Sequence, residues 1–510
     1  MNTVVIGKYL TFPDCQILYC TNSRYGDNCM SILNHDSFWN AIVSMPMTKK
    51  MLQLALRKCN ICGRTVLEAA LDDYGNKTEC RCGKCRPIYS KIITFWIEFL
   101  RRALGFKRSK VEQLLTDKYA RNAVLNLVES FEHFGIRKPM VLCAPFLVVW
   151  DFTHKCNLRC KHCYSNSGGE IGEEYKELST AQAFAVVDQL VEAHVTALAF
   201  SGGEPLTRDD FFEVVRYAAD RGLYISLATN GTLLTKENVQ KLKSAKVNYV
   251  DISIDGASAK THDEFRGVEG AFERAIVGLK NCVDADICTC IATTVGKNNL
   301  AELPSIIDLA EYYEAERFTY FNFIPAGRGK DYADQDLSPQ EREKVLRYLL
   351  NRMSSGCKTT ILATAPQLAR VAAQCQGLSG TGEVTLALAH MQTVQVTKKA
   401  VPLGDFIGGC GAGRLYCSIS PNGDVRPCVF LPLNVGNLKL QSFKDIWLNA
   451  TLFNAFRNRF NLKGSCSKCN FKFICKGCRA RSAAYHDGDT LNGDPGCIIG
   501  VKGTDTIEAY

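Results

Sequence analysis

A regular alternation of short apolar runs and amphipathic stretches over residues 146–353 constrains the fold of this chain most strongly. Runs rich in β-branched and aromatic residues predict six strands, at 146–152, 195–201, 223–229, 248–254, 286–294 and 317–323. Stretches of helical periodicity follow them, at 179–193, 209–221, 235–246, 270–282, 301–315 and 338–353. Strands joined by such crossovers run parallel, so the sequence predicts an α/β fold with a partial or complete barrel.

The 25 cysteines of the 510-residue chain fall mostly into three groups. Five lie between positions 59 and 85, three between 156 and 163, and eight between 410 and 497. The first residues show neither the charged start nor the apolar core of a secretory signal, and the chain is far longer than disulfide-stapled domains. We therefore expect a cytoplasmic protein whose grouped thiols bind metal.

Composition argues against several other classes of protein. The apolar fraction of 46% and the charged fraction of 22% are ordinary for a globular chain. A net charge of +9 is modest for this length, and no block of like charge indicates a nucleic-acid partner. No apolar run approaches the roughly 18 residues that span a bilayer; the segment 140–150, broken by Pro145, is better interpreted as a buried strand.

A CxxxCxxC pattern directly after the first predicted strand places Cys156, Cys160 and Cys163 in one loop. Three thiolates leave one iron of a four-iron cluster without a protein ligand. The amino and carboxylate groups of S-adenosylmethionine (SAM) can chelate that iron. Three cysteines with His154 or His162 could instead hold a structural zinc ion.

Three further motifs stand at the ends of neighbouring predicted strands: SGGEP at 201–205, TNGT at 229–232 and SIDG at 253–256. Carboxyl ends of strands in a β/α barrel meet at the face where such folds assemble active sites. Each motif is weak by itself, because Gly-Gly and Asn-Gly are common turns. Their order and equivalent positions, together with the cysteine loop, make the combination specific.

This combination resembles the radical SAM superfamily over about residues 146–330. The resemblance implies a partial (β/α)6 barrel of the TIM type and a SAM-binding 4Fe–4S cluster on the three cysteines. It implies that the SAM amino group is held by Gly202, Gly203 and Glu204, that the ribose and carboxylate lie near Asn230, Ser253 and Asp255, and that the carboxylate pairs with Arg266. A surface arginine is the alternative for Arg266. His162 departs from the pattern, since a hydrophobic or aromatic residue usually lies beside the adenine.

The same resemblance implies the reaction. A low-potential donor such as ferredoxin or flavodoxin reduces the cluster, SAM is cleaved to methionine and a 5′-deoxyadenosyl radical, and the radical abstracts hydrogen from an unactivated C–H bond. No catalytic acid or base is identified. Tyr164, Arg328 and Cys375 could face the substrate, but each has an ordinary structural alternative.

The C-terminal cysteines resemble the SPASM extension of this superfamily, including its Gly423-x4-Cys428 element and a closing Pro-Gly-Cys. Eight thiolates fully ligate two auxiliary 4Fe–4S clusters, and a pair of zinc ribbons is the alternative. The resemblance assigns one cluster to Cys410, Cys417, Cys428 and Cys478, and the other to Cys466, Cys469, Cys475 and Cys497. In this assignment Cys417 matters, because without it the first cluster would have an open iron.

The N-terminal extension carries two cysteine knuckles and an amphipathic, basic helix. The thiols that fit a tetrahedral site for zinc or a mononuclear, rubredoxin-like iron are Cys59, Cys62, Cys82 and Cys85, with Cys80 left over. An apolar stripe follows at helical spacing, formed by Ile88, Ile92, Phe95, Trp96, Phe99 and Leu100, with basic residues over 101–110. Such a helix either packs against its own core or lies peripherally on an anionic membrane.

We therefore expect an N-terminal extension (1–145), a core barrel (146–355), a bridge (356–409) and a SPASM domain (410–510). The expected function is that of a radical SAM oxidoreductase-type enzyme. The string CKGCRARSAAYHDGD…DPGC most resembles SPASM proteins of haem-type tetrapyrrole synthesis, so a tetrapyrrole side chain or a peptide is the expected substrate, with a lipid as the alternative. A multi-cluster electron carrier would need four thiolates at every cluster, which the loop at 156–163 contradicts.

Overall fold

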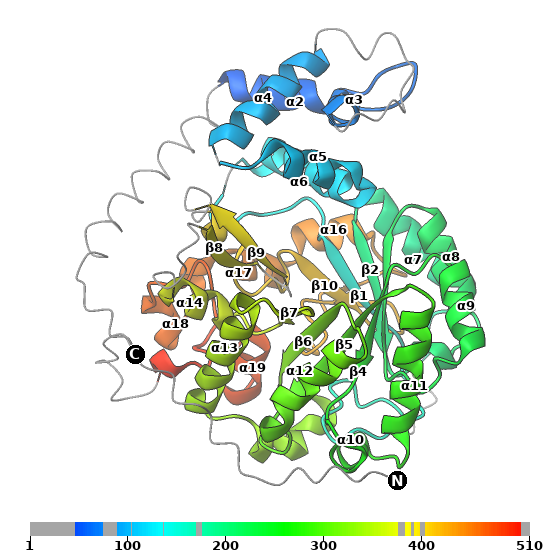
Figure 1. Cartoon of the computed structure of the whole chain (residues 1–510). Coiled ribbons are helices and arrows are strands. Elements are labelled where there is room, and N and C mark those ends of the chain that lie inside the picture. Colours follow the sequence, from blue (N-terminus) through cyan, green and yellow to red (C-terminus); the bar gives the residue numbers. More distant parts are fainter. Residues whose placement is uncertain are drawn as a thin grey trace.

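The computed structural model describes residues 46–74, 89–103, 105–135, 137–169, 176–375, 383–388, 392–397 and 403–500. Its central feature is a curved parallel sheet (Figure 1). The first six strands are β1 (Leu147–Thr153), β2 (Ala197–Gly202), β3 (Tyr224–Thr229), β4 (Tyr249–Ser253), β5 (Cys288–Val295) and β6 (Arg317–Asn322). The predicted α/β fold with a partial barrel is confirmed, and every predicted strand is present.

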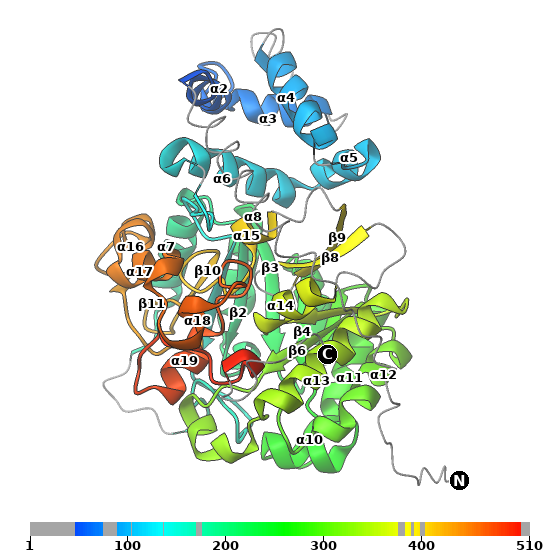
Figure 2. The same cartoon turned by 90° about the vertical axis from the view of Figure 1, so that its left-hand side faces the viewer.

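Helices cover the outer face of this sheet (Figures 1 and 2). They are α7 (Thr180–Glu192), α8 (Phe211–Asp220), α9 (Lys236–Ser244), α10 (Ala259–Arg266), α11 (Ala271–Asp284), α12 (Leu303–Tyr312) and α13 (Pro339–Ser354). Short 3₁₀ segments are η1 (Pro205–Thr207), η2 (Leu300–Glu302) and η3 (Gly327–Gln335). Local sequence fixes several helix starts: Ser179 with Gln182, and Ser338 with Glu341, form capping boxes that satisfy free backbone N–H groups.

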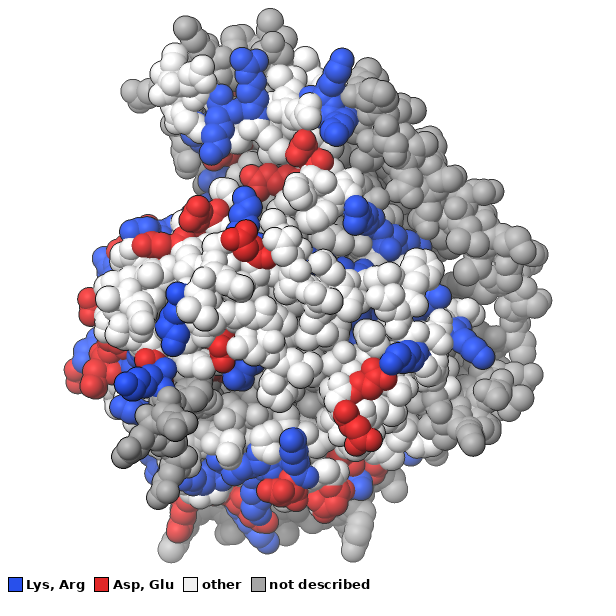
Figure 3. All heavy atoms as spheres, turned by 180° about the vertical axis from the view of Figure 1, so that it is seen from behind, with Lys and Arg blue, Asp and Glu red and all other residues white. Residues whose placement is uncertain are grey.

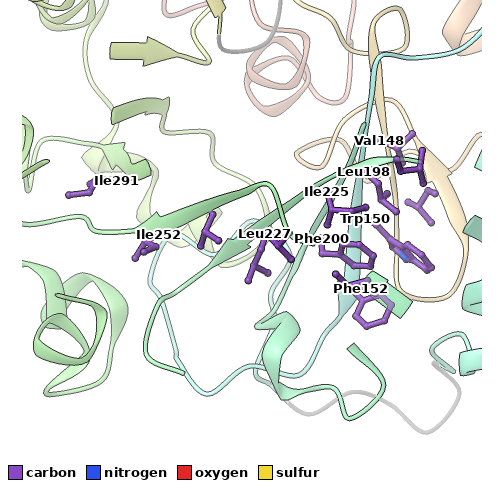
Figure 4. Packing of buried hydrophobic residues seen from close by; sticks show 14 of the residues in the cluster. Val148, Trp150, Phe152, Leu198, Phe200, Ile225, Leu227, Ile252 and Ile291 are labelled. Atoms are coloured by element: carbon purple, nitrogen blue, oxygen red, sulfur yellow. The ribbon is translucent and has the colours of Figure 1, made fainter. Parts of the chain in front are cut away.

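The main apolar core lies between the outer face of the sheet and these helices. Alternate residues of β1, namely Val148, Trp150 and Phe152, point into it. Figure 4 shows Leu198, Phe200 and Ile225 of neighbouring strands close to them, and the row of apolar residues continues along the sheet through Leu227, Ile252 and Ile291. Because side chains alternate along a strand, the intervening residues face the inside of the barrel, and this burial fixes the register.

The sheet continues beyond the predicted core at both edges. Strand β7 (Thr360–Ala363) pairs with β6 in parallel, inside the segment expected to be a bridge. Strand β10 (Tyr416–Ile419) pairs in parallel with β1, and β11 (Asp424–Arg426) and β12 (Gly436–Asn437) complete a ten-stranded sheet. The divisions expected at 355 and 410 therefore cut through one continuous sheet. The bridge also contains α14 (Gln367–Gln374) and a hairpin of β8 (Glu383–Leu388) and β9 (Gln392–Thr397).

Buried ion pairs join the C-terminal region to the barrel. Its helices are α15 (Leu403–Ile407), α16 (Phe443–Asn449), α17 (Thr451–Arg457), α18 (Gly464–Lys468) and α19 (Arg479–Tyr485), with 3₁₀ segments η5 (Arg459–Asn461) and η6 (Ile498–Gly500). The buried Arg481 of α19 lies 2.8 Å from Asp336 of the barrel and 3.3 Å from Asp494. It also donates to the carbonyl oxygen of Phe323 at 2.8 Å. The C-terminal region is thus attached to the barrel through a buried cation and two buried carboxylates, and loss of the cation would leave buried negative charge poorly compensated.

The N-terminal helices cover the end of the barrel opposite the carboxyl ends of its strands (Figures 1 and 2). They are α2 (Pro46–Leu56), α3 (Val66–Tyr74), α4 (Tyr89–Ala103), α5 (Arg108–Thr116) and α6 (Lys118–Phe134). Tyr119 of α6 packs edge-on against Tyr224, with ring centroids 5.0 Å apart, and its hydroxyl lies 3.5 Å from Asn248. Both partners stand at the amino ends of strands, so this unit closes that end of the barrel.

The face of helix α4 that packs against the other N-terminal helices is not the apolar stripe predicted from the sequence. The buried Ile93 packs with Leu71 and Tyr74 of α3. Phe95 and Phe99 of the stripe are 66% and 49% exposed. Packing on the protein's own core, one of the two alternatives that the sequence leaves open for the stripe, is therefore not found for Phe95 and Phe99. Within the described parts of the chain, no helix is both long and apolar enough to cross a bilayer.

Charged side chains of both signs are interspersed on the face shown in Figure 3. They lie mainly around its margins and leave a broad, largely uncharged centre. A face of this kind has no extended field of one sign that would attract a polyanion.

Candidate functional site

A cavity of about 170 Å³ opens at the carboxyl ends of the barrel strands. Its wall contains most of the residues that sequence analysis singled out: Cys156, Cys160, Cys163, Gly202, Gly203, Asn230, Ser253 and Arg266. Glu204 and Asp255 are absent from this wall and are completely buried. The structure thus brings the cysteine loop and the three strand-end motifs together around one space.

Polar donors approach each thiol of the cysteine loop. The N–H of Leu158 lies 3.4 Å from the Cys156 sulfur, the Ser165 hydroxyl 3.4 Å from Cys163, and the Arg266 guanidinium 3.7 Å from Cys160. Burial raises the pKa of Cys156 to about 11, so a bare thiol there stays protonated near neutral pH. Thiolates in this setting require a cation, and three of them at one cavity fit a 4Fe–4S cluster with one open iron.

The double glycine of the second strand end packs directly on the start of the cysteine loop. Gly202 has a φ of +114°, and a Cβ there would lie 2.6 Å from the Thr153 carbonyl oxygen. A Cβ on Gly203 would overlap the Lys155 carbonyl oxygen. The Gly203 N–H donates to Thr153 at 2.7 Å. Only glycine allows this close approach, which sets the position of the loop that leads to Cys156.

Glu204 joins two of the strand-end turns from behind the cavity wall. Its carboxylate accepts hydrogen bonds from the Thr229 hydroxyl at 2.9 Å, the Asn230 N–H at 2.8 Å and the Leu206 N–H at 3.2 Å. Burial raises its pKa to about 7 despite these donors. The SAM contact that the resemblance implies for Glu204 stays a prediction.

Arg266 is buried, which excludes the surface-arginine alternative. Its guanidinium lies 2.5 Å from Asp255, and burial raises the pKa of that carboxyl while Arg266 opposes the rise. His162 stacks on Phe265 with ring centroids 3.9 Å apart, and its Nε2 lies 3.4 Å from Asp255. Burial lowers the pKa of His162, so its neutral ring serves here as a flat, largely apolar surface.

Two carboxyl groups inside the barrel were missed by sequence analysis. Asp151 of β1 accepts a hydrogen bond from the Tyr164 hydroxyl at 2.8 Å, and burial raises its pKa to about 6. Asp251 of β4 lines the cavity and accepts from the Tyr249 hydroxyl at 2.7 Å. An acidic residue inside an otherwise apolar strand, as in VVWDF and YVDIS, was the available signal. Tyr164 also lines the cavity, as considered from the sequence.

The other two residues considered from sequence have different surroundings. Arg328 lines the cavity, but it donates to the carbonyl oxygens of Cys160 at 3.0 Å and Ser167 at 2.7 Å. It therefore holds the cysteine loop in place. Cys375 follows α14 and lies 3.5 Å from Arg347, and it lines neither this cavity nor the one beside it.

A second cavity, of about 180 Å³, adjoins the first and is lined mainly by apolar side chains. The wall residues that the two cavities share are Tyr164, Ser201, Ala228, Asp251, Phe321, Asn322, Ile324 and Phe430. The far wall includes Cys410, Cys428 and Cys478 of the C-terminal region. A molecule in this space would contact both the wall shared with the cavity of the cysteine loop and three C-terminal thiols.

Cys417 does not join those three thiols, contrary to the sequence prediction. Burial and then the neighbouring thiols Cys478 and Cys410 raise the pKa of Cys428. Burial also raises the pKa of Cys417, but its charged neighbour is Arg457. Cys417 belongs to the main apolar core on the outer side of the sheet.

The remaining four C-terminal cysteines lie near one another, as the second auxiliary set requires. Burial and neighbouring thiols raise the pKa of Cys475, and the neighbours include Cys497 and Cys466. Cys466 in turn affects the pKa of Cys469, after burial and a backbone hydrogen bond. N–H groups of Phe471, Gly477 and Arg479 lie 3.4, 3.4 and 3.7 Å from the sulfurs of Cys469, Cys475 and Cys466. This donor set fits a fully ligated cluster.

Four buried cations lie close enough to Cys410 to interact with its charge: Arg414, Arg459, Lys476 and Arg479. In the part of the chain that the structure describes, none of them pairs with a carboxylate; they donate to backbone carbonyls and, for Arg479, to a sulfur. After burial, Lys476 and Arg479 are among the groups that act on the pKa of Cys410, which they lower. Buried positive charge of this kind fits anionic, thiolate-ligated clusters.

Only part of the N-terminal knuckle lies in the described residues. Cys59 and Cys62 stand in a turn closed by hydrogen bonds from the Cys59 N–H to Arg64 at 2.8 Å and from the Gly63 N–H to Cys59 at 2.9 Å. The Ile61 N–H lies 3.5 Å from the Cys59 sulfur. This geometry is suited to a metal ligand, but Cys80, Cys82 and Cys85 lie outside the described residues.

A cysteine loop at the open end of a partial β/α barrel, with a Gly-Gly turn packed beneath it, defines the class of SAM-binding iron–sulfur enzymes. Comparison with sequence families agrees. Residues 150–310 match the radical SAM superfamily, and residues 410–470 match SPASM, an iron–sulfur cluster-binding domain. The chain belongs to the radical SAM superfamily and carries a SPASM domain that binds 4Fe–4S clusters.

Several relatives align with this chain over most of their own length. An AdoMet-dependent heme synthase of Methanosarcina barkeri is 39% identical over 70% of this chain and 97% of its own. An Fe-coproporphyrin III synthase of the same organism is 30% identical, over 69% and 88%. The mycofactocin maturase MftC of Mycolicibacterium smegmatis is 33% identical, over 74% and 87%. The predicted similarity to tetrapyrrole-synthesis SPASM proteins is confirmed.

Solved structures share the fold. SuiB of Streptococcus suis bound to S-adenosylmethionine superposes with a TM-score of 0.58 at 19% identity, covering 81% of this chain and 89% of that one. The enzyme anSMEcpe with bound AdoMet superposes with a TM-score of 0.51 at 19% identity, over 69% and 94%.

Substituting Gly203 by alanine should displace the cysteine loop, since the new Cβ overlaps the Lys155 carbonyl. A shift of about 1 Å in positioning groups costs on the order of 100-fold in rate, and we expect a loss of that size in 5′-deoxyadenosine formed from SAM. The matched control is Gly169→Ala, whose Cβ would meet nothing closer than 3.9 Å. Equal rates for the two variants, at equal iron content, would contradict this account of the turn.

Proposed function

We propose that this enzyme modifies a side chain of a tetrapyrrole by abstracting hydrogen from an unactivated C–H bond. The observation that carries the proposal is the second cavity, which joins the SAM-binding end of the barrel to the SPASM thiols and is mainly apolar. A porphyrin presents a large apolar ring, which such a wall would bind through burial of its faces. The similarity to an AdoMet-dependent heme synthase supports this choice of substrate.

The protein's own residues would bind, orient and exclude water. When bound, the reduced 4Fe–4S cluster and SAM supply a 5′-deoxyadenosyl radical as the hydrogen-abstracting species. Cys156, Cys160 and Cys163 would hold that cluster, and Gly202, Gly203, Glu204, Asn230, Ser253, Asp255 and Arg266 would position SAM. The apolar residues of the shared wall, such as Phe321 and Ile324, would keep water and other hydrogen donors away from the substrate. Tyr164 and Asp151 hold a proton between them where the two cavities meet.

A peptide is the second candidate substrate, because the mycofactocin maturase is also similar over most of its length. The test uses reconstituted protein under anaerobic conditions with SAM, dithionite and either iron-coproporphyrin III or candidate precursor peptides. We expect 5′-deoxyadenosine formation to rise several-fold with the porphyrin, and the porphyrin to change mass. Stimulation by a peptide alone would reject the tetrapyrrole proposal in favour of the peptide.

Filling the second cavity should abolish that stimulation. Ala369 of α14 lines the cavity, and a phenylalanine there would occupy much of its 180 Å³. We expect Ala369→Phe to lose at least about tenfold in porphyrin-dependent product, since overpacking a binding site excludes its ligand. The control is Tyr312→Phe, at a residue 78% exposed on the outer surface. Normal porphyrin turnover in Ala369→Phe would show that the substrate binds elsewhere.

A further inference from the structure

Pairing of β10 with β1 fixes which side of the sheet each residue of β10 faces. Tyr416 lies opposite Leu147, and Cys417 lies opposite Val148. Leu147 and Tyr416 both line the second cavity, inside the barrel. Val148 belongs to the main core on the outer face, as does Cys417. Successive side chains of a strand point to opposite faces, so no rotation of the Cys417 side chain brings its sulfur into the cavity.

The other three predicted ligands of this cluster do meet at the cavity. Cys410, Cys428 and Cys478 all line it, and all three belong to one buried group that also contains Tyr416. Among the described residues, no fourth cysteine lines this cavity. Cys417 is separated from them by the sheet itself.

We propose that the first auxiliary cluster is held by Cys410, Cys428 and Cys478 alone, and that its fourth iron opens to the second cavity to accept an anionic donor from the substrate. Direct coordination would anchor the substrate between this cluster and the SAM site. The inference rests on the SPASM domain's binding of iron–sulfur clusters, not on the tetrapyrrole proposal, so either can fail separately.

Charge in the surrounding protein favours an anion at that position. Arg414, Arg459 and Lys476 are buried close enough to Cys410 to interact with its charge, and none has a carboxylate partner in the described residues. A cluster with three thiolates carries one negative charge fewer than one with four. A carboxylate or another anionic donor on the open iron would restore that charge, and buried positive charge makes its binding favourable.

The first test counts iron in protein that cannot bind the SAM cluster. In a background with Cys156, Cys160 and Cys163 replaced by alanine, the SPASM clusters are the only expected source of acid-labile sulfide after anaerobic reconstitution, because a mononuclear iron at the N-terminal knuckle would contain none. We expect Cys417→Ala to keep the parent's SPASM-bound iron and sulfide, whereas Cys428→Ala loses about half. Cys417→Val, which leaves no cavity in the core, repeats the measurement if the alanine variant folds poorly. Loss of about half the iron in both Cys417 variants would overturn the proposal.

The second test detects the open iron directly. In the same background, ¹³C-cyanide is added to dithionite-reduced protein, and ¹³C hyperfine coupling is measured by electron–nuclear double resonance. We expect coupling in the parent and in Cys417→Val, and none in Cys428→Ala. Absence of coupling in the parent would overturn the proposal. Tyr416 lines the same cavity, so Tyr416→Phe is measured as well. Coupling that appears in Tyr416→Phe but not in the parent would overturn the proposal, because the tyrosine oxygen would then be the fourth ligand of the iron.

Discussion

Reductive cleavage of SAM is expected to fall by more than about 1,000-fold when Cys163 is replaced by alanine. Cys156, Cys160 and Cys163 act as one unit at the first cavity, and loss of any member of such a unit removes most of its effect. The product to follow is 5′-deoxyadenosine, measured by mass spectrometry after anaerobic reconstitution with SAM and dithionite.

The matched control for this substitution is Cys375→Ala. Cys375 is partly buried, but it lines neither cavity, so its loss should leave 5′-deoxyadenosine formation within about twofold. If Cys163→Ala forms the product as fast as the unaltered enzyme, the cluster assignment is wrong. If the unaltered enzyme forms no 5′-deoxyadenosine either, despite full iron content, the result would favour a multi-cluster electron carrier.

Replacing Arg481 by methionine should destabilise the whole enzyme by about 3–5 kcal/mol, because two buried carboxylates lose their shared cation. Asp336 and Asp494 lie 2.8 and 3.3 Å from this guanidinium, and all three side chains are almost completely buried. A methionine of similar length fills the space. It leaves Asp494 without an ion-pair partner among the described residues, and Asp336 with Arg342 alone, 2.6 Å away. The expected sign is a large fall in the urea concentration at which tryptophan fluorescence reports unfolding, under anaerobic conditions.

Lys241→Met provides the comparison for that measurement. Lys241 pairs with Glu237 on the surface of α9, where both side chains are largely exposed, so its removal should change the urea midpoint only slightly. A shift for Arg481→Met no larger than that for Lys241→Met would mean that the buried charges are not coupled as the distances indicate.

Local pattern in the sequence was enough to predict the barrel and the first cavity. The strands have apolar, β-branched runs, and the motifs SGGEP, TNGT and SIDG stand where parallel strands end, so topology alone brings them together. Strands β7 and β10 were missed because four residues carry too little periodicity to be distinguished from a loop.

Long-range pairing decided what the sequence left open. The eight cysteines of the SPASM segment suggested two complete sets of four ligands, but the face on which Cys417 lies depends on the register of β10 against β1. The face of α4 that is buried depends likewise on where α3 packs, and Ile93 was not part of the predicted stripe. Neither the side of the sheet on which Cys417 lies nor the buried face of α4 can be predicted from the local sequence alone.

Pairing of β10 with β1 also constrains the order in which this protein can be made. β1 is among the first barrel strands to leave the ribosome, yet its outer neighbour, Tyr416–Ile419, is synthesised only after the rest of the barrel. Until then β1 presents unpaired backbone groups along one edge, which is the kind of surface that promotes aggregation. Cofactor loading of the cysteine-rich tail and closure of the barrel edge are therefore late events in biosynthesis that involve the same segment of chain.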